Sequence, residues 1–449
     1  MQKVSQRPET IAAIATPHGQ GGIGVVRLSG SDLASVAALL LGKVPEPRRA
    51  TYASFLDSHG QAMDQGIALF FPAPHSYTGE DVLELQGHGG TAILQMVLQR
   101  CLELGARLAQ PGEFTQRAFL NNKLDLAQAE SVADLIAATT SQAARSAMRS
   151  LQGDFSRAVH RLVDELILLR MLVEAMLDFP EEEIDVPDTM QRDTRLSALL
   201  TELEKILSLA KQGSLLREGA HIVLVGQPNV GKSSLLNRLS GGDIALVSEF
   251  PGTTRDLISQ SIQISGVPLH IIDTAGLREA EDTVERMGIA RTYGAVNKAD
   301  AILVLMDASR GKTDSDQKIL DELPLEIPRL YIFNKIDLLA RPGSMEEHCG
   351  ECHIYLSAKT GEGIDYLHQK LLSLLGWHQE SGIYMARERH VQALMSAKNH
   401  LQRAAGEIVR PELCAEELRL AQESLNSITG EFSADDLLGE IFGRFCIGK

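Results

Sequence analysis

The chain has 449 residues, a length that corresponds to about three domains, each with a hydrophobic core of its own. Its composition, 44% hydrophobic and 23% charged residues, is that of a soluble globular protein, and no stretch approaches the ~18 uncharged apolar residues of a membrane-spanning helix. The formal net charge of −16 disfavours a broad electrostatic grip on a nucleic-acid backbone, because such footprints are usually basic. Any contact with RNA is therefore expected to be local or shared with a partner.

The sequence shows neither an export signal nor a disulfide framework. Residues 1–17 lack a basic start followed by an apolar core and a cleavage site of small residues. Five cysteines spread over the whole length fit a reducing compartment. We therefore expect a cytoplasmic protein.

Residues 1–120 are expected to form a compact α/β domain. The runs Gly24–Leu28 and Ile67–Phe71 are typical of strands, and Thr91–Leu104 is typical of a helix. From residue 121 the apolar residues recur at three- and four-residue steps, as in Val159, Leu162, Val163 and Leu166, which is the pattern of packed amphipathic helices. Residues 121–215 are therefore predicted to be the first half of a helical domain, with an acidic joint at residues 180–187.

Residues 216–376 follow a different pattern, in which short apolar strands alternate with glycine-rich turns and helices. This alternation is typical of a doubly wound α/β domain. Residues 377–449 return to a helical pattern, with apolar positions such as Leu394, Ala397 and Leu401. The predicted fold class is thus multidomain α/β plus α, with the second α/β domain inserted into the helical domain.

A phosphate-binding loop is predicted at Gly226–Ser233, which matches the pattern G-x-x-x-x-G-K-[ST]. The apolar run His221–Val225 predicts the strand that must precede this loop. In such a loop the backbone N–H groups face the phosphates, Lys232 reaches the β and γ oxygens, and Ser233 binds Mg²⁺.

Three further elements follow in the order that a guanine-nucleotide site requires. Asp273–Gly276 follows an apolar run and places a carboxylate for the magnesium shell. In Asn334–Asp337, Asp337 is expected to accept the N1 and N2 donors of guanine, a pair that adenine lacks. A main-chain N–H of the segment Ser357–Lys359 is expected to donate a hydrogen bond to the guanine O6.

These four elements resemble the Ras-like GTPases over about residues 218–375, and Pro251–Asp256 resembles switch I of the bacterial Era-type branch. The resemblance implies that Thr254 joins Ser233 around Mg²⁺. The GTP contacts that it implies are Asn229, Val230, Gly231, Lys232, Ser233, Ser234, Ser248, Thr253, Thr254, Asp273, Thr274, Ala275, Gly276, Asn334, Lys335, Asp337, Ser357, Ala358 and Lys359.

Leu277 stands where Ras-like enzymes commonly carry the glutamine that orients the attacking water, and an alkyl chain cannot do this. One interpretation is a slow switch; the other is that catalysis depends on groups elsewhere. The resemblance implies a K⁺ ion near the phosphates, which performs the charge compensation of an arginine finger. Its expected ligands are Asn229, Ser248, Phe250 and Thr253, and the group expected to orient water is Glu285, although spacing alone favours a solvated switch II face for this acid.

Segments outside the nucleotide motifs narrow the resemblance. They are the tail Cys446–Lys449 with Leu437–Phe445 before it, and the N-terminal pair Gly19–Gly30 and Tyr77–Gly90. Together with the inserted G domain, they resemble the tRNA uridine-5-carboxymethylaminomethyl modification GTPases (the MnmE or TrmE family) over essentially the whole chain.

This resemblance implies a homodimer whose N-terminal domain binds 5-formyl-tetrahydrofolate or another one-carbon tetrahydrofolate. Arg27, Glu84, Lys123 and Lys449 fall at the family's folate positions, although each taken alone would be an ordinary surface charge or salt bridge. The family also implies an FAD-dependent partner (MnmG, also called GidA) in a heterotetramer or larger complex, acting on the C5 position of a tRNA wobble uridine. Cys446 is expected to serve this modification, with a buried structural thiol as the alternative.

Several other patterns are interpreted as chance matches. Gly19-x-Gly21-x-x-Gly24 fits a dinucleotide fingerprint, but a strand rather than a helix is expected after it. Cys446 begins a poor prenylation box. His348–His353 contains Cys349 and Cys352 in what is predicted to be a loop, without a second pair to complete a zinc site. Cys101 and Cys414 are expected to pack within helices.

Two other functions fit parts of the sequence. A regulatory or ribosome-assembly GTPase of the Era type would share Pro251–Asp256 but should carry an RNA-binding module and a basic patch. A folate enzyme with a structural G domain is disfavoured by the intact nucleotide motifs. The sequence does not decide which folate species donates the carbon, and it predicts weak tRNA binding by this chain alone.

Overall fold

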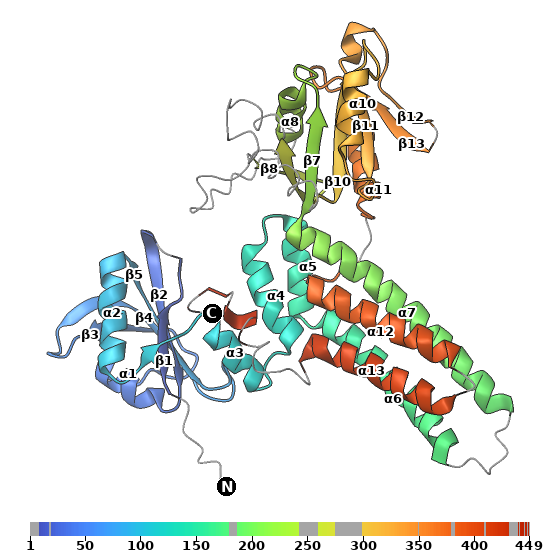
Figure 1. The fold of residues 1–449 in the computed structure, drawn as a ribbon. Helices are drawn as coiled ribbons and strands as arrows, with labels where there is room; N and C mark the ends of the chain where they lie inside the picture. The colour runs from blue at the N-terminus through green and yellow to red at the C-terminus, as the bar shows by residue number, and fades with distance from the viewer. Residues whose placement is uncertain are drawn as a thin grey trace. The chain divides into compact units, whose positions relative to one another are not determined.

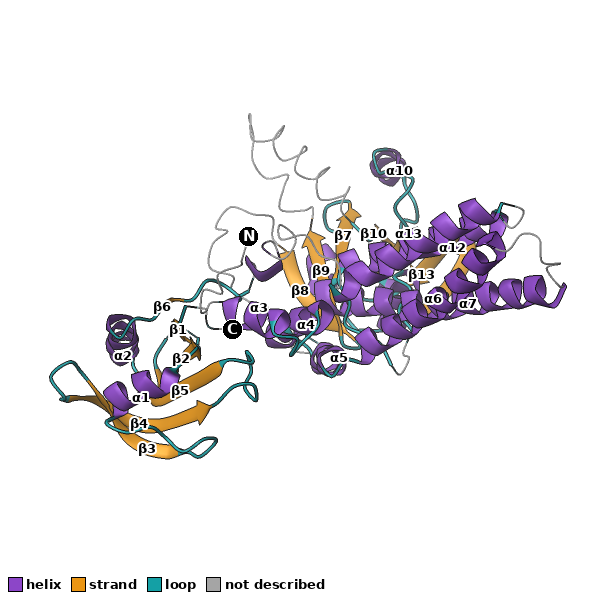
Figure 2. Ribbon diagram, turned by 90° about the horizontal axis from the view of Figure 1, so that it is seen from below, coloured by secondary structure: helices purple, strands orange, loops and turns teal. Residues whose placement is uncertain are grey.

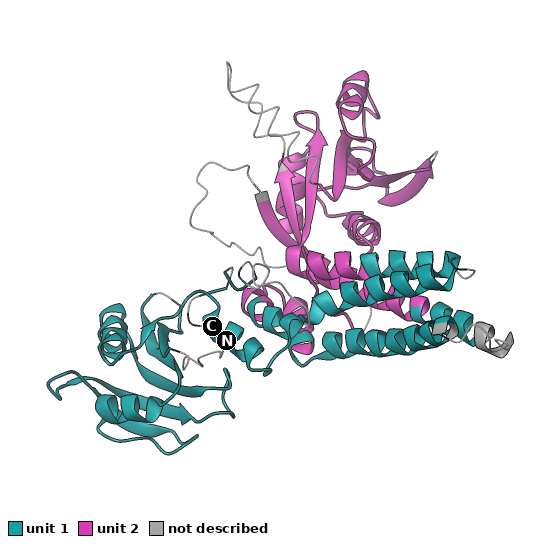
Figure 3. Cartoon of the chain, turned by 60° about the horizontal axis from the view of Figure 1, so that its bottom comes forward, with its two compact units in different colours: residues 1–133, 150–199, 396–449 teal, residues 134–149, 200–395 magenta. Residues whose placement is uncertain are grey.

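A computed structural model describes residues 9–17, 19–178, 186–241, 259–273, 299–348, 350–378, 382–407, 410–430, 439, 441–443, 445–446 and 448. The chain divides into two compact units (Figure 3): Met1–Ala133, Ser150–Leu199 and Ser396–Lys449 form unit 1, and Asp134–Arg149 and Leu200–Met395 form unit 2. Across the described ranges, no helix is both long and apolar enough to pass through a lipid bilayer.

Unit 1 begins with a six-stranded sheet in the order β3-β4-β5-β2-β1-β6 (Figure 1). Neighbouring strands are antiparallel except for the parallel pair β1 and β6. The strands are β1 (Ile11–Ile14), β2 (Gly21–Gly30), β3 (Thr51–Leu56), β4 (Ala62–Phe71), β5 (Asp81–Gly89) and β6 (Arg107–Leu108). The unbroken strand β2 confirms that the glycines at 19–24 are not a dinucleotide fingerprint.

Helices α1 (Leu33–Leu41) and α2 (Thr91–Glu103) lie over one face of this sheet (Figure 2). Their apolar sides meet alternate strand residues such as Val26, Leu28 and Leu85, and the cluster excludes water on that face. Cys101 of α2 is fully buried in it, as expected, and burial raises the pKa of this thiol to about 12.

The helices after the first sheet range from 8 to 33 residues. They are α3 (Glu113–Leu120), α4 (Leu126–Ala137), α5 (Ser141–Leu151), α6 (Asp154–Asp178), α7 (Val186–Glu218), α12 (Glu388–Gly406) and α13 (Pro411–Thr429). Within unit 1, α13 packs along α6, and Arg170 Nη1 donates to Gln422 Oε1 at 2.6 Å. Cys414 is buried on α13, which confirms its expected packing.

Unit 2 contains a seven-stranded sheet in the order β12-β13-β11-β10-β7-β9-β8. The five inner strands are parallel, and the edge strands β12 and β8 are antiparallel to their neighbours. The strands are β7 (Ala220–Gly226), β8 (Ser259–Ile264), β9 (Val267–Asp273), β10 (Ala301–Asp307), β11 (Arg329–Asn334), β12 (Ser344–His348) and β13 (Glu351–Tyr355).

Both faces of this sheet are buried. Ile222 and Leu224 of β7 point into the cluster that includes helices α8 (Lys232–Ser240) and α11 (Ile364–Leu374), whereas Val223 and Val225 point into the cluster on the side of α10 (Asp314–Asp321). Burial on both faces explains why the inner strands are continuous apolar runs. The doubly wound α/β prediction is confirmed for this part of the chain.

The loop predicted for His348–His353 is wrong for His348 and for Glu351–His353, which lie in strands. Strands β12 and β13 form an antiparallel hairpin, in which Cys352 lies in β13 opposite Glu347. Cys352 is buried, and burial raises the pKa of its thiol. Cys349 lies outside the described residues. Among the His, Cys, Asp and Glu residues that are described, no group of three is placed to hold a metal ion.

Candidate functional site

The loop between β7 and α8 has a backbone shaped to surround an anion. Its φ angles are positive at Gly226 (151°), Asn229 (63°) and Gly231 (102°), and such reversals turn successive N–H groups toward a common centre. Gly231 is required sterically as well, since a Cβ there would lie 2.3 Å from Asn334 Nδ2. The N-terminus of α8 follows at once and adds its own favourable field for negative charge.

Lys232 is buried inside this loop. Its Nζ donates hydrogen bonds to the carbonyl oxygens of Gly226 at 2.7 Å and Gln227 at 3.0 Å. Ser233 and Ser234 lie in the first turn of α8 with exposed side chains. Lys232 and Ser233 therefore lie together where the phosphate-binding loop joins α8.

The parallel register places the backbone of Asp273 beside this loop. Asp273 is the last residue of β9, and its register partner on β7 is Leu224, two residues before the loop begins. A carboxylate at this strand end and a serine at the start of α8 fit the oxygen ligands that Mg²⁺ prefers. The following predicted site residues lie outside the described residues: Ser248, Phe250, Thr253, Thr254, Thr274, Ala275, Gly276, Leu277 and Glu285.

The predicted base-binding residues meet at the ends of β11 and β13. Asn334 is buried, its Nδ2 donates to the carbonyl oxygen of Val230 at 2.8 Å, and its Oδ1 accepts from the N–H of Ala358 at 2.9 Å. Asp337 accepts a hydrogen bond from Ser357 Oγ at 2.7 Å. One asparagine thus joins the phosphate loop to the segment Ser357–Lys359.

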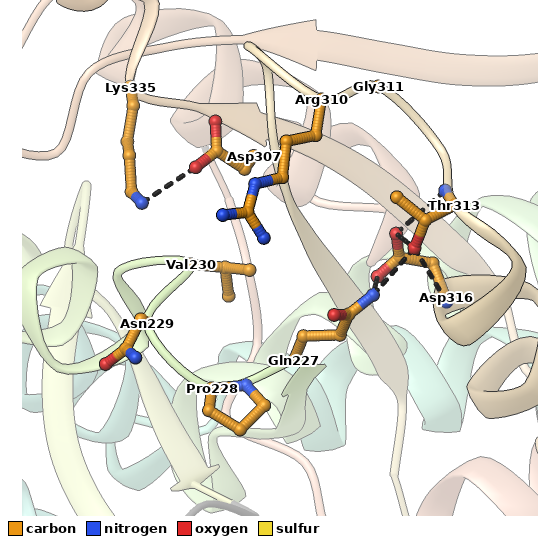
Figure 4. A pocket seen from close by; sticks show the side chains of 10 residues that line it. All are labelled: Gln227, Pro228, Asn229, Val230, Asp307, Arg310, Gly311, Thr313, Asp316 and Lys335. Atoms are coloured by element: carbon orange, nitrogen blue, oxygen red, sulfur yellow. Dashed lines mark hydrogen bonds and ion pairs between the residues drawn. The ribbon is translucent and has the colours of Figure 1, made fainter.

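Lys335 takes a positive φ of 70° and pairs with Asp307, the last residue of β10, at 2.8 Å. Partial burial favours the neutral form of Asp307, but hydrogen bonds from Lys335 and Ser309 outweigh it and lower the pKa of Asp307 to about 2. The pair lines a cavity of about 110 Å³ beside the phosphate loop, which Figure 4 shows from close by. The cavity is lined by Gln227, Pro228, Asn229, Val230, Asp307, Arg310, Gly311, Thr313, Asp316 and Lys335.

The lining residues that sequence reasoning missed include Gln227, Asp307, Thr313 and Asp316. Gln227 Nε2 donates to Thr313 Oγ1 at 2.7 Å and to Asp316 Oδ1 at 2.8 Å. The spacing Thr313-x-x-Asp316 is a capping box, which the sequence displays, but its contact with the phosphate loop depends on the strand order.

The N-terminal candidates Arg27 and Glu84 meet on neighbouring strands β2 and β5. Their side chains pair at 2.8 Å, and both are largely buried. The Arg27 guanidinium lies 5.9 Å from the ring centres of Tyr77 and Phe114. Arg27 and Glu84 therefore form one polar, aromatic-lined group within unit 1.

The C-terminal segment reaches this group. Arg27 Nη1 donates to the carbonyl oxygen of Gly448 at 3.3 Å, and the N–H of Gly112 donates to the carbonyl oxygen of Cys446 at 3.4 Å. The thiol of Cys446 is exposed, which contradicts the alternative of a buried structural thiol. Lys123 instead donates to the carbonyl oxygen of Pro74 at 2.9 Å, and Lys449 lies outside the described residues.

A phosphate loop at the carboxyl end of the parallel strands, with a guanine-type carboxylate, Asp337, just beyond β11 two strands away, defines a P-loop GTPase. Two family models match the chain: "GTP-binding protein TrmE N-terminus" over residues 10–123, and "MnmE helical domain" over residues 126–446. The chain belongs to the MnmE family of tRNA modification GTPases.

Curated relatives match along the whole length. The "tRNA modification GTPase MnmE" of Nitrosomonas europaea is 60% identical over 98% of this chain and 99% of the relative. The protein of that name from Chromobacterium violaceum is 57% identical over 99% of this chain and 100% of the relative. Among solved structures, Era from Aquifex aeolicus is 25% identical over 40% of this chain and 66% of its own, with a TM-score of 0.28, a value too low to add to the argument.

The family assignment settles the enzymatic class. The protein is a GTPase of tRNA modification, with GTP and Mg²⁺ as the ligands of its G domain and tRNA as its substrate. This decides against a ribosome-assembly GTPase of the Era type.

Proposed function

We propose that this GTPase is activated by K⁺ and works in a complex that modifies the C5 position of a tRNA wobble uridine. A one-carbon tetrahydrofolate supplies the carbon unit, and an FAD-dependent partner of the MnmG type completes the complex. The observation that carries the proposal is the convergence of Arg27, Glu84 and the Cys446 segment on one group in unit 1.

The residues of this group suit a pterin. The Glu84 carboxylate can accept two N–H donors of an aminopyrimidine, and the partly exposed ring of Tyr77 offers an apolar face to a flat heterocycle. The Tyr77 hydroxyl is hydrogen-bonded to Thr115 Oγ1 at 2.8 Å, which fixes the position of the ring. Lys123 and Lys449 are proposed to hold the anionic tail of the ligand, by the family resemblance alone.

The folate proposal is tested by calorimetric titration of the full-length protein with 5-formyl-tetrahydrofolate. Glu84→Gln keeps a hydrogen bond to Arg27 but removes the charge, and we expect it to weaken binding about tenfold or more. Glu103→Gln changes a half-exposed glutamate of α2 and is the matched control. Equal affinity of the Glu84→Gln protein and the unchanged protein would refute the assignment.

Cys446 is proposed to act in the modification reaction rather than in GTP hydrolysis. Its exposed thiol lies next to Phe445, which is anchored in an apolar cluster with Leu126 and Ala129. Cys446→Ser is therefore expected to retain GTP turnover and to lose tRNA modification in an assay with the partner protein. Retained modification would remove Cys446 from the reaction.

The cation proposal rests on Asn229 and Leu277. Asn229 is exposed at the left-handed bend of the phosphate loop, where an amide oxygen is free to bind a cation. Leu277 provides no group to orient water, so charge compensation and water positioning need other groups, for which we propose K⁺ and Glu285. Ser248, Phe250 and Thr253 are the further proposed ligands of K⁺.

The first measurement is GTP turnover in matched KCl and NaCl buffers, with Asn229→Ala beside the unchanged protein. We expect turnover at least tenfold faster in KCl, and loss of this difference in Asn229→Ala. The same buffers with a GTP analogue test whether K⁺ promotes pairing of G domains in the proposed homodimer. Equal rates in both salts would exclude K⁺ as an activator and leave the folate proposal untouched.

A further inference from the structure

Asp316 is a buried carboxylate in the first turn of α10 that does more than cap its helix. Its Oδ2 accepts hydrogen bonds from the N–H of Thr313 at 3.0 Å and from Thr313 Oγ1 at 2.7 Å, which completes the capping box. Its Oδ1 accepts from Gln227 Nε2 at 2.8 Å, from a residue 89 positions away in the chain. Capping of the helix explains the hydrogen bonds to Oδ2. It does not explain the hydrogen bond from Gln227 to Oδ1.

Gln227 connects this carboxylate to the lysine of the phosphate loop. Its side chain donates to Thr313 and Asp316, and its carbonyl oxygen accepts a hydrogen bond from Lys232 Nζ at 3.0 Å. Two hydrogen bonds therefore link Asp316 to Lys232. Figure 4 shows Gln227 extending from the loop toward Thr313 and Asp316, which line the same cavity.

The loop needs such a brace because it combines left-handed backbone conformations with exposed side chains. Gly226 and Asn229 both take positive φ, and the side chains of Pro228 and Asn229 between the brace and Val230 are exposed. The second half of the loop is held by Asn334 through the carbonyl of Val230. The first half has the hydrogen bonds of Gln227 as its corresponding side-chain anchor.

We propose that Asp316 is a positioning residue of the GTPase reaction. It fixes Gln227 and, through the Gln227 carbonyl, the position of Lys232 and of the backbone N–H groups that receive the phosphates. Asp316 does not itself belong to the nucleotide contacts. The role depends on the GTPase activity alone and is independent of K⁺ and of folate.

The test is a double-mutant cycle on the full-length protein, with release of a fluorescent GDP derivative as the readout. The variants are Gln227→Ala, Asp316→Ala and the double variant, with Asp314→Ala as a control on the exposed side of the same helix turn. We expect each single change to speed release about tenfold, the double variant to release no faster than the singles, and Asp314→Ala to match the unchanged protein. Multiplying effects in the double variant, or unchanged release in Gln227→Ala, would overturn the proposal.

A helix that loses its cap can lower stability without any effect on the loop, so a second variant leaves the cap intact. Gln227→Glu places a second carboxylate against Asp316, and repulsion between the two is relieved when one of them is protonated. We expect release of the GDP derivative to be faster than in Gln227→Ala at pH 8.5 and to approach it at pH 6. Release equal to that of the unchanged protein at pH 8.5 would refute the brace even if Asp316→Ala does not fold.

Discussion

Asn334 donates a hydrogen bond to the carbonyl oxygen of Val230, and the two residues lie 104 positions apart in the chain. The same amide accepts from the N–H of Ala358. A single buried side chain therefore holds the phosphate end and the base end of the nucleotide site at a fixed separation. The site is preorganised by this amide as well as by the strands beneath it.

Asn334→Ala is expected to damage both stability and nucleotide binding. It leaves the Val230 carbonyl and the Ala358 N–H buried without their partner, at a cost of about 2–4 kcal/mol in the free energy of unfolding. The affinity for GDP should fall at least tenfold, measured by fluorescence titration at a temperature where the variant is folded. Asn399→Ala, at an exposed position of α12, is the control and should change neither quantity. Unaltered GDP affinity in Asn334→Ala would show that the amide does not organise the site.

Glu285→Ala is expected to separate binding from turnover. If Glu285 orients the attacking water, its loss should leave the dissociation constant for GTP within about twofold and slow single-turnover hydrolysis by 10²-fold or more. Glu281→Ala changes a neighbouring acid of the same segment and should hydrolyse GTP normally. Single-turnover hydrolysis at the normal rate in Glu285→Ala would assign water positioning to another group.

Glu113 is expected to make the stability of the N-terminal domain depend on acid pH. Burial alone would raise the pKa of Glu113, but hydrogen bonds from Arg107, the N–H of Gln110 and Arg117 outweigh burial and lower the pKa from 4.5 to about 2. Because the folded-state pKa is depressed, the stabilisation is complete above pH 4.5 and is lost as the pH falls toward 2.

Glu113→Gln removes that part of the pH dependence. At pH 7 the variant should be less stable by about 2 kcal/mol, and the difference from the unchanged protein should shrink between pH 5 and pH 3. Thermal unfolding followed by circular dichroism at pH 7, 5, 4 and 3 measures the difference. A gap in melting temperature that stays constant over this range would contradict the assignment of charge to Glu113.

Two helical glycines should respond in opposite ways to alanine. A Cβ on Gly213 of α7 would lie 1.6 Å from the carbonyl oxygen of Tyr384, whereas a Cβ on Gly406 of α12 meets no atom within 4 Å. Gly213→Ala is therefore expected to lower stability by about 1–3 kcal/mol or more, and Gly406→Ala to be neutral or stabilising by up to ~1 kcal/mol. The melting temperatures of the two variants test this prediction. Similar changes in melting temperature in both variants would contradict the close approach of Tyr384 to α7.

The sequence predicted the second α/β unit well because its motifs follow continuous apolar runs. Strands buried on both faces must be apolar throughout, which makes them easy to find in the sequence. Because these strands are parallel, the residues at their carboxyl ends, such as Gly226, Asp273 and Asn334, lie at the same sheet edge. The hairpin at Ser344–Tyr355 was missed for the opposite reason. Its outer strand, β12, lies at the sheet edge and needs few apolar residues, as Glu346 and Glu347 show, so no apolar run marks it in the sequence.

Contacts between distant segments could not be predicted from periodicity. The pairing of Gln227 with Asp316 depends on β10 lying next to β7, which no local pattern encodes. The approach of Gly448 to Arg27 likewise follows from how the C-terminal segment packs on Leu126 and Ala129. Residues in the switch segments, Glu285 among them, lie outside the described residues, and their roles stay predictions.

The apolar cluster on one face of the parallel sheet extends beyond the sheet's own helices. Leu209 and Leu216 of α7, together with Trp377 and Ile383 beyond α11, are buried in the same cluster as Leu235 and Ile354.

A fragment that begins at β7 and ends at β13 would therefore expose apolar side chains that are buried in this cluster. The smallest piece able to fold alone should begin about three turns before the end of α7 and run past Ile383. A chimeric protein in which the G domain of a relative replaces this one only between the nucleotide-binding motifs should therefore be poorly folded. The chimera should fold when the end of α7 and the segment around Trp377 are taken from the same relative as the G domain.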